Sequence, residues 1–431
     1  MNYISTRKNK ERVSFKEAVI NGLSNNKGLY IPEDIPQLPS SFYENIETFN
    51  DHEIAFEVLK PFVKDSLSDQ QLRQIISETL SFPMPVVEVQ ENLFALELFH
   101  GPTQAFKDVG ARFMSRVLSH FYSNKKENLI VLVATSGDTG SAVANGFYNV
   151  PGVTVKILFP KGKVTPYQEY QMTSLGGNID AIEVDGTFDD CQKLVKEAFN
   201  DDELISQVSI STANSINVAR LLPQMLYYFF AYKQLKGQLR GKKLIVSVPS
   251  GNLGNITAGL MAQKMGLPIF HFVAALNAND TFLTYLNTGT YEEKLSVPTY
   301  ANAMDVGNPS NIERIIHLFR DDPKPINETI SAHSFSNEQL LQEIKQCYRD
   351  NDYLLDPHGA IGKLALSQHL NENTVGIFLG TAHPQKFSEV IQKAIPSYSV
   401  ESIKSDMCNK KIIKNSFNDL KQIILCTAKP H

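Results

Sequence analysis

One lysine in the segment FHGPTQAFKDVGARF, residues 99–113, has the sequence context of a reactive amine. Gly101 and Pro102 predict a turn between a buried strand within residues 92–101 and a helix that begins near Lys107. Burial at such a junction lowers the pKa of a lysine and leaves more of it neutral, as a Schiff base with a carbonyl cofactor requires. The alternative is a lysine whose stem covers an apolar edge.

Three polar turns follow three predicted strands and offer groups that bind anions. Residues 135–140 supply hydroxyls, backbone N–H groups and a helix N-terminus, although an ordinary capped helix explains the same residues. Residues 250–255 contain two glycines, which let the backbone approach a phosphate closely, but they match neither GxGxxG nor GxxxxGK[ST]. Residues 379–384 offer the hydroxyl of Thr381, or only a turn before a helix.

A further polar segment, residues 211–220, leads into a predicted helix. The spacing puts Asn217, Arg220 and Gln224 on one helical face. Arg220 can bind a phosphate or carboxylate through two hydrogen bonds, and a polar contact between domains is the alternative interpretation.

Other polar residues are less specific. Lys161 and Lys163 follow another predicted strand and can help to hold an anion. The histidines, including His271 and His358, have neither triad nor metal spacing, so we expect structural roles and no metal site.

Apolar runs alternate with amphipathic helices after residue 86. The runs carry few polar residues, as is typical of strands buried on both faces, so the sequence predicts an α/β fold with largely parallel sheets. In such folds ligands lie beyond the carboxyl ends of the strands, where the three turns fall. The predicted strands are Leu129–Ala134, Thr154–Phe159, Ile179–Val184, Leu244–Val248, Ile269–Ala274 and Val375–Leu379.

The first part of the chain has a different pattern. Ser14 and Glu17 have the spacing of a capping box, and two further helices are predicted near residues 51–63 and 69–80. Pro83 and Pro85 mark a boundary, so we predict a mostly helical N-terminal domain over residues 1–85. Residues 86–431 then form the second region, with two interleaved α/β subdomains, the smaller at roughly 110–220.

Composition narrows the classes of function. The 431 residues are 42% hydrophobic and 20% charged, with a net charge of -5, so there is no basic footprint for nucleic acid or an acidic membrane. The four cysteines, Cys191, Cys347, Cys408 and Cys426, form no CxxC pair, which fits a reducing compartment. With neither a signal peptide nor a long apolar span, we expect a cytoplasmic location.

Taken together, these segments resemble the threonine synthases, pyridoxal-phosphate enzymes of the tryptophan-synthase-β group, or fold type II. The likeness runs nearly from end to end, and relatives with other substrates lack the N-terminal part. The motifs that carry it are YISTR, SFKEAVINGL, GLYIPEDIP, HGPTQAFKD, TSGDTGSA, NSINVARLLPQ, PSGNLGNITAG, DVGNPSNIER, DPHGAIG and LGTAHPQKF.

The resemblance implies roles for the candidate residues around pyridoxal 5'-phosphate. Lys107 would form the internal aldimine, and Phe106 would pack near the ring. Thr381 would face the pyridine nitrogen, where a hydroxyl leaves the ring largely unprotonated. The loop that would bind the cofactor phosphate is Gly251, Asn252, Leu253, Gly254 and Asn255.

Asp138 departs from many relatives, which have an asparagine at the cofactor's phenolic oxygen. An ionised carboxylate would repel a phenolate, so we expect Asp138 to be protonated or turned toward backbone N–H groups. The residues expected to anchor the substrate are Thr135, Ser136, Gly137, Thr139, Gly140, Lys161, Asn217 and Arg220.

The reaction implied is the conversion of O-phospho-L-homoserine and water to L-threonine and phosphate, the last step of threonine biosynthesis. Lys107 would serve as general acid and base during γ-elimination and addition of water at Cβ. Two alternatives stay open: a phospho-lyase on O-phosphohomoserine or O-phosphothreonine that releases 2-oxobutyrate, and a non-catalytic binding protein. The expected assembly is a monomer or a small homo-oligomer.

Overall fold

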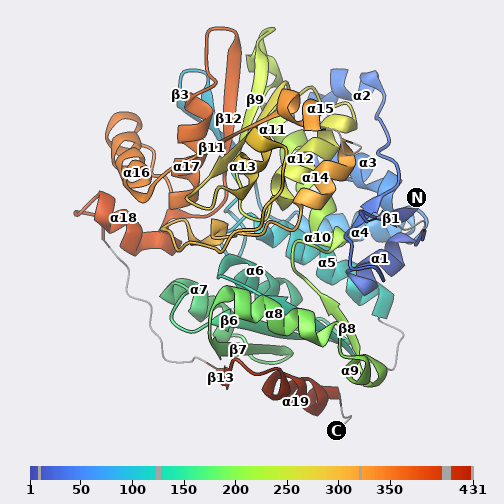
Figure 1. Ribbon diagram of the computed structural model, residues 1–431. Coiled ribbons are helices and arrows are strands. Elements are labelled where there is room, and N and C mark those ends of the chain that lie inside the picture. Colours follow the sequence, from blue (N-terminus) through green and yellow to red (C-terminus); the bar gives the residue numbers. More distant parts are fainter. Residues whose placement is uncertain (8–10, 123–127, 320–322, 400–408, 429–431) are drawn as a thin grey trace.

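The polar turns lie at the ends of strands in two separate sheets (Figure 1). The computed structural model describes residues 1–7, 11–122, 128–319, 323–399 and 409–428. In Figure 1 a small body with its own sheet lies below a larger one, and the N-terminal helices lie beside the larger body. This arrangement confirms the predicted α/β class with parallel sheets.

The larger sheet has six strands. They are β3 Val86–Gln90, β4 Leu93–Glu97, β9 Lys243–Pro249, β10 His271–Leu276, β11 Ile330–Ser334 and β12 Thr374–Gly380. Their order is β11-β10-β9-β12-β4-β3, and every neighbouring pair is parallel except β3 with β4. The carboxyl ends of β9 and β12 therefore bring the turns at residues 250–255 and 379–384 to one edge.

The smaller sheet has five parallel strands. They are β5 Leu129–Ala134, β6 Val153–Pro160, β7 Ile179–Asp185, β8 Ser209–Thr212 and β13 Lys410–Lys414. The order is β13-β7-β6-β5-β8. All six residues of β5 are buried, which explains its uninterrupted apolar sequence. The turn at residues 135–140 follows this central strand.

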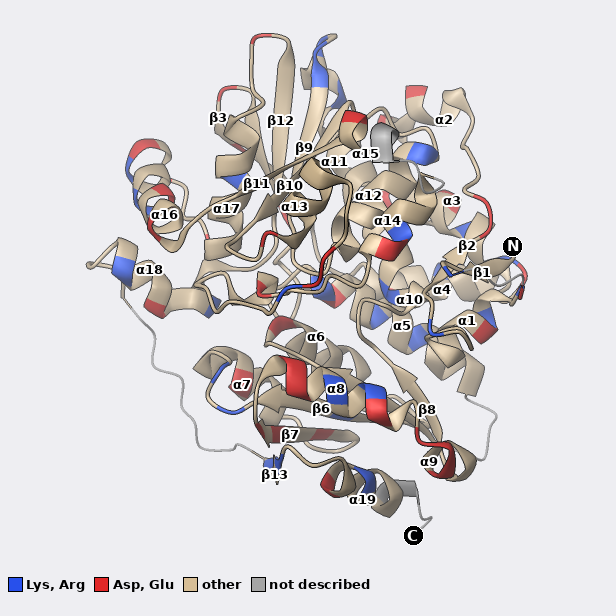
Figure 2. Ribbon diagram, in the orientation of Figure 1, with Lys and Arg blue, Asp and Glu red and all other residues tan. Residues whose placement is uncertain are grey.

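Helices cover both sheets. The bounds are α1 Phe15–Asn21, α2 Ser40–Glu44, α3 Asp51–Val63, α4 Asp69–Thr79, α5 Lys107–Tyr122, α6 Asp138–Phe147, α7 Pro166–Thr173, α8 Phe188–Ala198, α9 Asp202–Gln207, α10 Val218–Leu221, α11 Met225–Leu239, α12 Gly254–Lys264, α13 Thr281–Thr288, α14 Ile312–Leu318, α15 Pro323–Thr329, α16 Asn337–Asn351, α17 Pro357–Ser367, α18 Ser388–Ala394 and α19 Phe417–Ala428. Helix α17 packs on β9, β10 and β12, while α6 and α8 pack on the smaller sheet. Figure 2 shows charged residues on outer helices such as α8, α16 and α19.

The N-terminal segment folds as its capping signals predict. Ser14 caps α1 through a complete capping box with Glu17, and α3 and α4 match the predicted helices. Strands β1, Tyr3–Ser5, and β2, Tyr30–Pro32, add a small antiparallel pair. The boundary at residue 85 stays a prediction.

Some strands differ from the sequence expectation. The strand predicted at Ile269–Ala274 begins instead at His271, because the amide of Ile269 bonds the carbonyl of Leu267 within a turn. Strands β3, β8, β11 and β13 were not predicted. All four lie at sheet edges, and β13 pairs with β7 although it lies far beyond the predicted range of 110–220.

Candidate active site

A pocket lies where elements of both sheets meet. Its walls come from the start of α5, the turns after β5, β9 and β12, the start of α8, and residues 303–306. The space between the pocket walls that no atom fills is about 1000 Å³, and part of it is open solvent. Lys107, Asp138, Arg220 and Thr381 all line it.

Backbone hydrogen bonds bring Lys107 and Thr381 to the same wall. The amide of Phe106 donates to the carbonyl of Thr381 over 2.9 Å, and Ala105 forms an isolated bridge with Ala382. The hydroxyl of Tyr227 donates to the carbonyl of Phe106 over 2.6 Å. Hydrogen bonds thus hold the turn before Lys107 from two sides, as is required to fix the direction of a reactive side chain.

The amine of Lys107 has the properties predicted for a nucleophile. It lies 5.7 Å from the ring centre of Phe106, and it has no hydrogen-bond partner among the described residues. Burial lowers the pKa of Lys107 to about 8; Asp138 opposes that shift, and Arg220 and Lys386 add to it. Part of the Lys107 amine is therefore uncharged, and hence nucleophilic, near pH ~7.

Asp138 is neither protonated nor turned toward backbone N–H groups, so both expectations were wrong. Its Oδ1 lies 2.7 Å from Nζ of Lys386 and accepts a hydrogen bond from Nε2 of Gln168 over 3.0 Å. Burial alone would raise the pKa of Asp138, but Lys386, followed by Lys107 and His358, outweighs burial and lowers it. The carboxylate is ionised because a buried ammonium ion faces it.

The turn after β5 presents only part of its polar residues to the pocket. Thr135, Ser136 and Thr139 line the pocket, whereas Gly137 and Gly140 do not. The hydroxyl of Thr135 accepts from the amides of both glycines, over 2.9 and 2.8 Å. A Cβ at Gly137, where φ is +138°, would lie 2.3 Å from the side chain of Gln168. These glycines shape the turn.

The turn after β9 forms a cradle of backbone atoms. Leu253 has a left-handed conformation, with φ of 59°, just before α12 begins at Gly254. A Cβ on Gly251 would lie 2.8 Å from Cα of Met304, so only glycine fits there. The Nδ2 atom of Asn255 is buried and has no hydrogen-bond partner among the described residues, and the N-terminus of α12 faces the same pocket. Such a cradle suits an anion.

Arg220 is a buried cation at the pocket wall. Its Nη1 donates to the carbonyl of Ala213, but its Nε is buried and finds no hydrogen-bond partner in the part of the chain that the structure describes. Burial lowers the pKa of Arg220 to about 10, which leaves it charged at neutral pH. Gln224, on the predicted common face, also lines the pocket, and its buried Oε1 accepts no hydrogen bond from the described residues.

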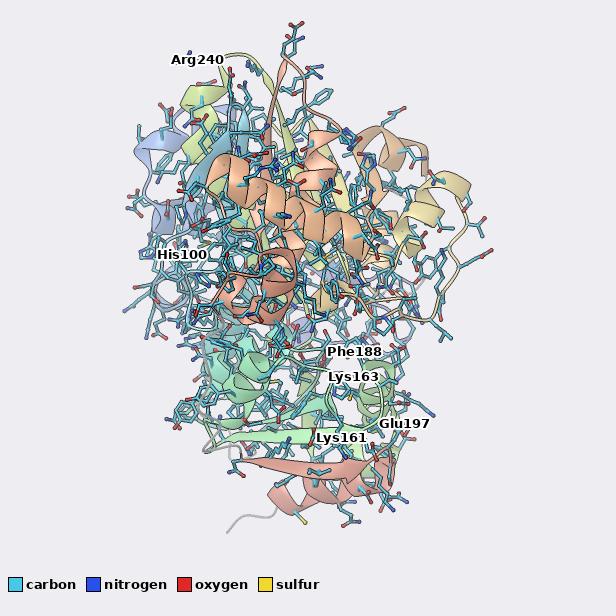
Figure 3. All side chains as sticks on the ribbon, turned by 90° about the vertical axis from the view of Figure 1, so that its left-hand side faces the viewer. His100, Lys161, Lys163, Phe188, Glu197 and Arg240 are labelled. Atoms are coloured by element: carbon cyan, nitrogen blue, oxygen red, sulfur yellow. The ribbon has the colours of Figure 1, made fainter. Side chains whose placement is uncertain are left out.

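Besides Gly137 and Gly140, two further predicted substrate residues, Asn217 and Lys161, lie outside the pocket. Asn217 caps α10, and its Nδ2 donates to the carbonyls of Val19 and Thr212 over 2.9 and 3.1 Å. Lys161 is exposed on the small body, next to Lys163 (Figure 3). The sequence placed Lys161 correctly after strand β6, but Lys161 does not line the pocket.

The sequence did not predict His358 and Lys386 as residues of the site. His358 lines the pocket, and its Nδ1 lies 2.5 Å from Oδ2 of Asp356, while its Nε2 accepts from the amide of Ala303 over 3.3 Å. Both residues lie in motifs quoted for the resemblance, DPHGAIG and LGTAHPQKF. The position of Lys386, five residues after Thr381, is the sequence signal that could have identified it.

Comparisons with known proteins agree with this geometry. The profile of the family described as "Threonine synthase N terminus" matches residues 2–80, and that of "Pyridoxal-phosphate dependent enzyme" matches residues 76–380. Threonine synthase of Escherichia coli is 42% identical over 384 residues, which cover 89% of this chain and 88% of that protein. The chain belongs to the threonine synthase family.

Solved threonine synthases share the whole fold. The Escherichia coli structure is 38% identical with a TM-score of 0.93, covering 99% of this chain and 100% of the other. The pyridoxal-phosphate-bound threonine synthase of Brucella melitensis is 31% identical with a TM-score of 0.91, and both chains are covered completely. The function is thus that of a threonine synthase, a pyridoxal-phosphate-dependent lyase, and neither a phospho-lyase nor a binding protein is favoured.

The pocket fits the cofactor of a threonine synthase. Lys107 offers a partly neutral amine for the aldehyde, and the cradle around Gly251 offers backbone N–H groups for the phosphate. Among the described residues, no group of histidine, cysteine or acidic side chains has the arrangement of a metal site. In the same residues, no helix is both long and apolar enough to cross a membrane.

Proposed function

We propose that the substrate is O-phospho-L-homoserine, which reacts with water to give L-threonine and phosphate. The observation that supports this most is the set of three anion-binding features around Lys107. They are the hydroxyls of Ser136 and Thr139, the cradle after β9, and the guanidinium of Arg220. Substrate carboxylate, cofactor phosphate and substrate phosphate require three such sites.

Each site has a proposed occupant. Gly251 to Asn255 hold the cofactor phosphate, because the N-terminus of α12 and close backbone approach favour a dianion there. Ser136 and Thr139 hold the substrate carboxylate. Arg220 is assigned to the substrate phosphate, because its Nε lacks a hydrogen-bond acceptor among the described residues.

Pyridoxal phosphate, when bound, supplies the electron sink for the carbanionic steps. Lys107 carries protons between the substrate's Cα and Cβ, since its amine has a lowered pKa and lies in the pocket wall. Thr381 and Phe106 position the ring, and Lys386 holds the carboxylate of Asp138 in an ion pair.

The deciding experiment uses the purified enzyme with O-phospho-L-homoserine. We expect threonine as the main product, together with an equal amount of phosphate. Mostly 2-oxobutyrate would identify a phospho-lyase and overturn the proposal.

The attachment residue is tested separately. Borohydride reduction of the enzyme with its cofactor, followed by peptide mapping, should place the label on Lys107. Lys107→Ala should lose the near-visible absorbance band and at least about a thousandfold in kcat, roughly 4 kcal/mol of barrier. Lys161→Ala, an exposed lysine outside the pocket, is the matched control and should keep both.

We also propose a cytoplasmic enzyme that acts as a monomer or small homo-oligomer. The described cysteines, Cys191, Cys347 and Cys426, are unpaired, which supports a reducing compartment, and Cys408 lies outside the described residues. Fractionation of cells and light scattering of the purified protein test the two statements.

A further inference from the structure

Arg314, near the start of α14, is a fully buried arginine outside the residues assigned so far. Its guanidinium uses all five N–H donors. Nε and Nη2 donate to the carbonyl of Tyr30 over 3.0 and 2.7 Å, and Nη2 also donates to the carbonyl of Ile216 over 2.6 Å. Nη1 donates to the carbonyl of Ser215 over 3.2 Å and to Oδ1 of Asn311 over 2.7 Å.

Every one of these acceptors is neutral. The adjacent carboxylate, Glu313, instead accepts from Thr6 over 2.9 Å and forms an ion pair with Arg7 at 2.6 Å. Burial lowers the pKa of Arg314 to about 9, and Glu313 opposes that shift only in part. A buried charge is costly when no counter-ion neutralises it, so a bound anion nearby would stabilise this arrangement.

Two short paths join Arg314 to the turn that we assign to the cofactor phosphate. Along the first, Nδ2 of Asn311 donates to the carbonyl of Asn252 over 2.9 Å. Along the second, the Nδ2 atom of Asn252 donates to Oγ of Ser215 over 2.6 Å, and the Ser215 carbonyl accepts from Arg314. Asn311 and Ser215 also lie directly under Gly254, since a Cβ there would be 3.4 and 3.5 Å from them.

The guanidinium therefore lies beneath the turn and beneath the N-terminus of α12. Its donors go to backbone carbonyls and to Oδ1 of Asn311, and no ion pair among the described residues balances its positive charge. An anion held by the turn would lie on the opposite side of the same few side chains. The helix N-terminus favours an anion at that position too.

We propose that Arg314 is a positioning residue for the phosphate-binding turn, which it holds in shape through Asn311 and Ser215 while its charge is balanced by the bound phosphate. The inference rests on the proposed assignment of residues 251–255 to that phosphate. Through Tyr30, the same side chain ties the N-terminal strand β2 to the cofactor site.

The test compares pyridoxal phosphate with pyridoxal, which has the same ring and aldehyde but no phosphate. Apoprotein is titrated with each aldehyde and the absorbance change is followed. In Arg314→Met we expect affinity for pyridoxal phosphate to fall about ten- to a hundredfold and that for pyridoxal by less than about threefold. Arg314→Lys keeps the charge but loses most of the hydrogen bonds, so we expect an intermediate loss.

Three results bear on the inference besides the expected one. An unchanged affinity for pyridoxal phosphate in Arg314→Met would overturn it, and so would an equal loss for both aldehydes, which indicates general damage. Equal affinity of the unaltered apoprotein for the two would remove the phosphate assignment, and this inference with it. Arg349→Met, an exposed arginine on α16, is the control and should bind both normally.

If Arg314→Met does not fold, Asn311→Asp takes its place. Aspartate keeps an acceptor for Arg314, neutralises its charge and removes the donor to Asn252. We expect the same selective loss of pyridoxal phosphate affinity, and normal binding of that cofactor would contradict the proposal. The titrations use no substrate, so their outcome is independent of the threonine assay.

Discussion

The carboxylate of Asp138 and the ammonium of Lys386 form an ion pair at 2.7 Å, with side chains that are 3% and 0% exposed. Lys386 also donates to the carbonyl of Thr103 over 2.8 Å, and the amide and hydroxyl of Thr103 bond Asp108, the residue after Lys107. One lysine from the segment after β12 thus contacts both the turn after β5 and the start of the reactive helix.

Removal of either partner should leave an uncompensated buried charge. We expect Lys386→Met to lower the free energy of unfolding by roughly 3–5 kcal/mol, as is found when one member of a buried pair is removed. In the double variant Lys386→Met with Asp138→Asn, part of that loss should return. Urea unfolding of the four proteins measures the coupling, and additive effects would show that the two charges do not depend on each other.

The lowered pKa of Lys107 gives the apoprotein a defined pH dependence. The rate at which pyridoxal phosphate attaches should rise with pH and level off above about 8, since only the neutral amine reacts. Asp138 raises the pKa of Lys107, so Asp138→Asn should move the midpoint to lower pH. A midpoint near the ordinary value of 10.5 would contradict a desolvated amine. Stopped-flow absorbance measures the rate.

The free energy of unfolding should also depend on pH through the titration of Lys107. The folded pKa, about 8, is below the ordinary value of 10.5, so the unfolded chain binds more protons between these values. The contribution of Lys107 to stability therefore increases as pH rises through that window. Lys107→Met should flatten this part of the curve of unfolding free energy against pH, and an unchanged slope would show that the amine is well solvated.

Arg220 should act on the substrate and not on the cofactor. Arg220→Lys keeps a charge but loses the planar fork, so we expect KM for the phosphorylated substrate to rise about ten- to a hundredfold. The absorbance band of the bound cofactor should stay. Loss of the band would mean that Arg220 serves the cofactor's own phosphate, and Arg349→Lys controls for nonspecific effects of the exchange.

Gly251→Ala should damage the cradle directly. The new Cβ would approach Cα of Met304 to 2.8 Å, and a backbone neighbour cannot move as a side chain can. We expect cofactor affinity to fall at least tenfold, about 1.4 kcal/mol. Gly237→Ala, on the exposed side of α11, is the matched control; it should bind normally and stabilise the protein by about 0.5–1 kcal/mol. Normal cofactor binding by Gly251→Ala would show that the turn can shift.

Central strands could be predicted from sequence because burial on both faces leaves a continuous apolar run. Strands β5 and β12 have every residue buried, and their predicted bounds were correct within one residue. Edge strands lack this signal: β11 reads ISAHS and β13 reads KKIIK, so neither has the pattern of a buried strand. These edge strands form because they pair with strands that are distant in the sequence.

The residues of the candidate site were likewise predictable only where the local sequence carries a clear signal. The three turns were predictable because each follows a buried strand, and Lys107 because it begins an amphipathic helix after a glycine–proline turn. The ion-pair partner of Asp138 was not predictable, because Lys386 lies 248 positions further along the chain and only tertiary packing brings the two residues together. Lys161 shows the converse case, because a position after a strand does not decide whether the side chain faces a pocket.

Strand β13 has a consequence for the order in which the chain can fold on a ribosome. Until residue 414 has been translated, β7 has an open edge, with the backbone donors and acceptors of Ile179–Asp185 unpaired on that side. Such an edge can recruit a strand from a second nascent chain. Synthesis that stalls shortly before this point should therefore yield aggregates, which a separately supplied peptide of residues 409–428 would suppress.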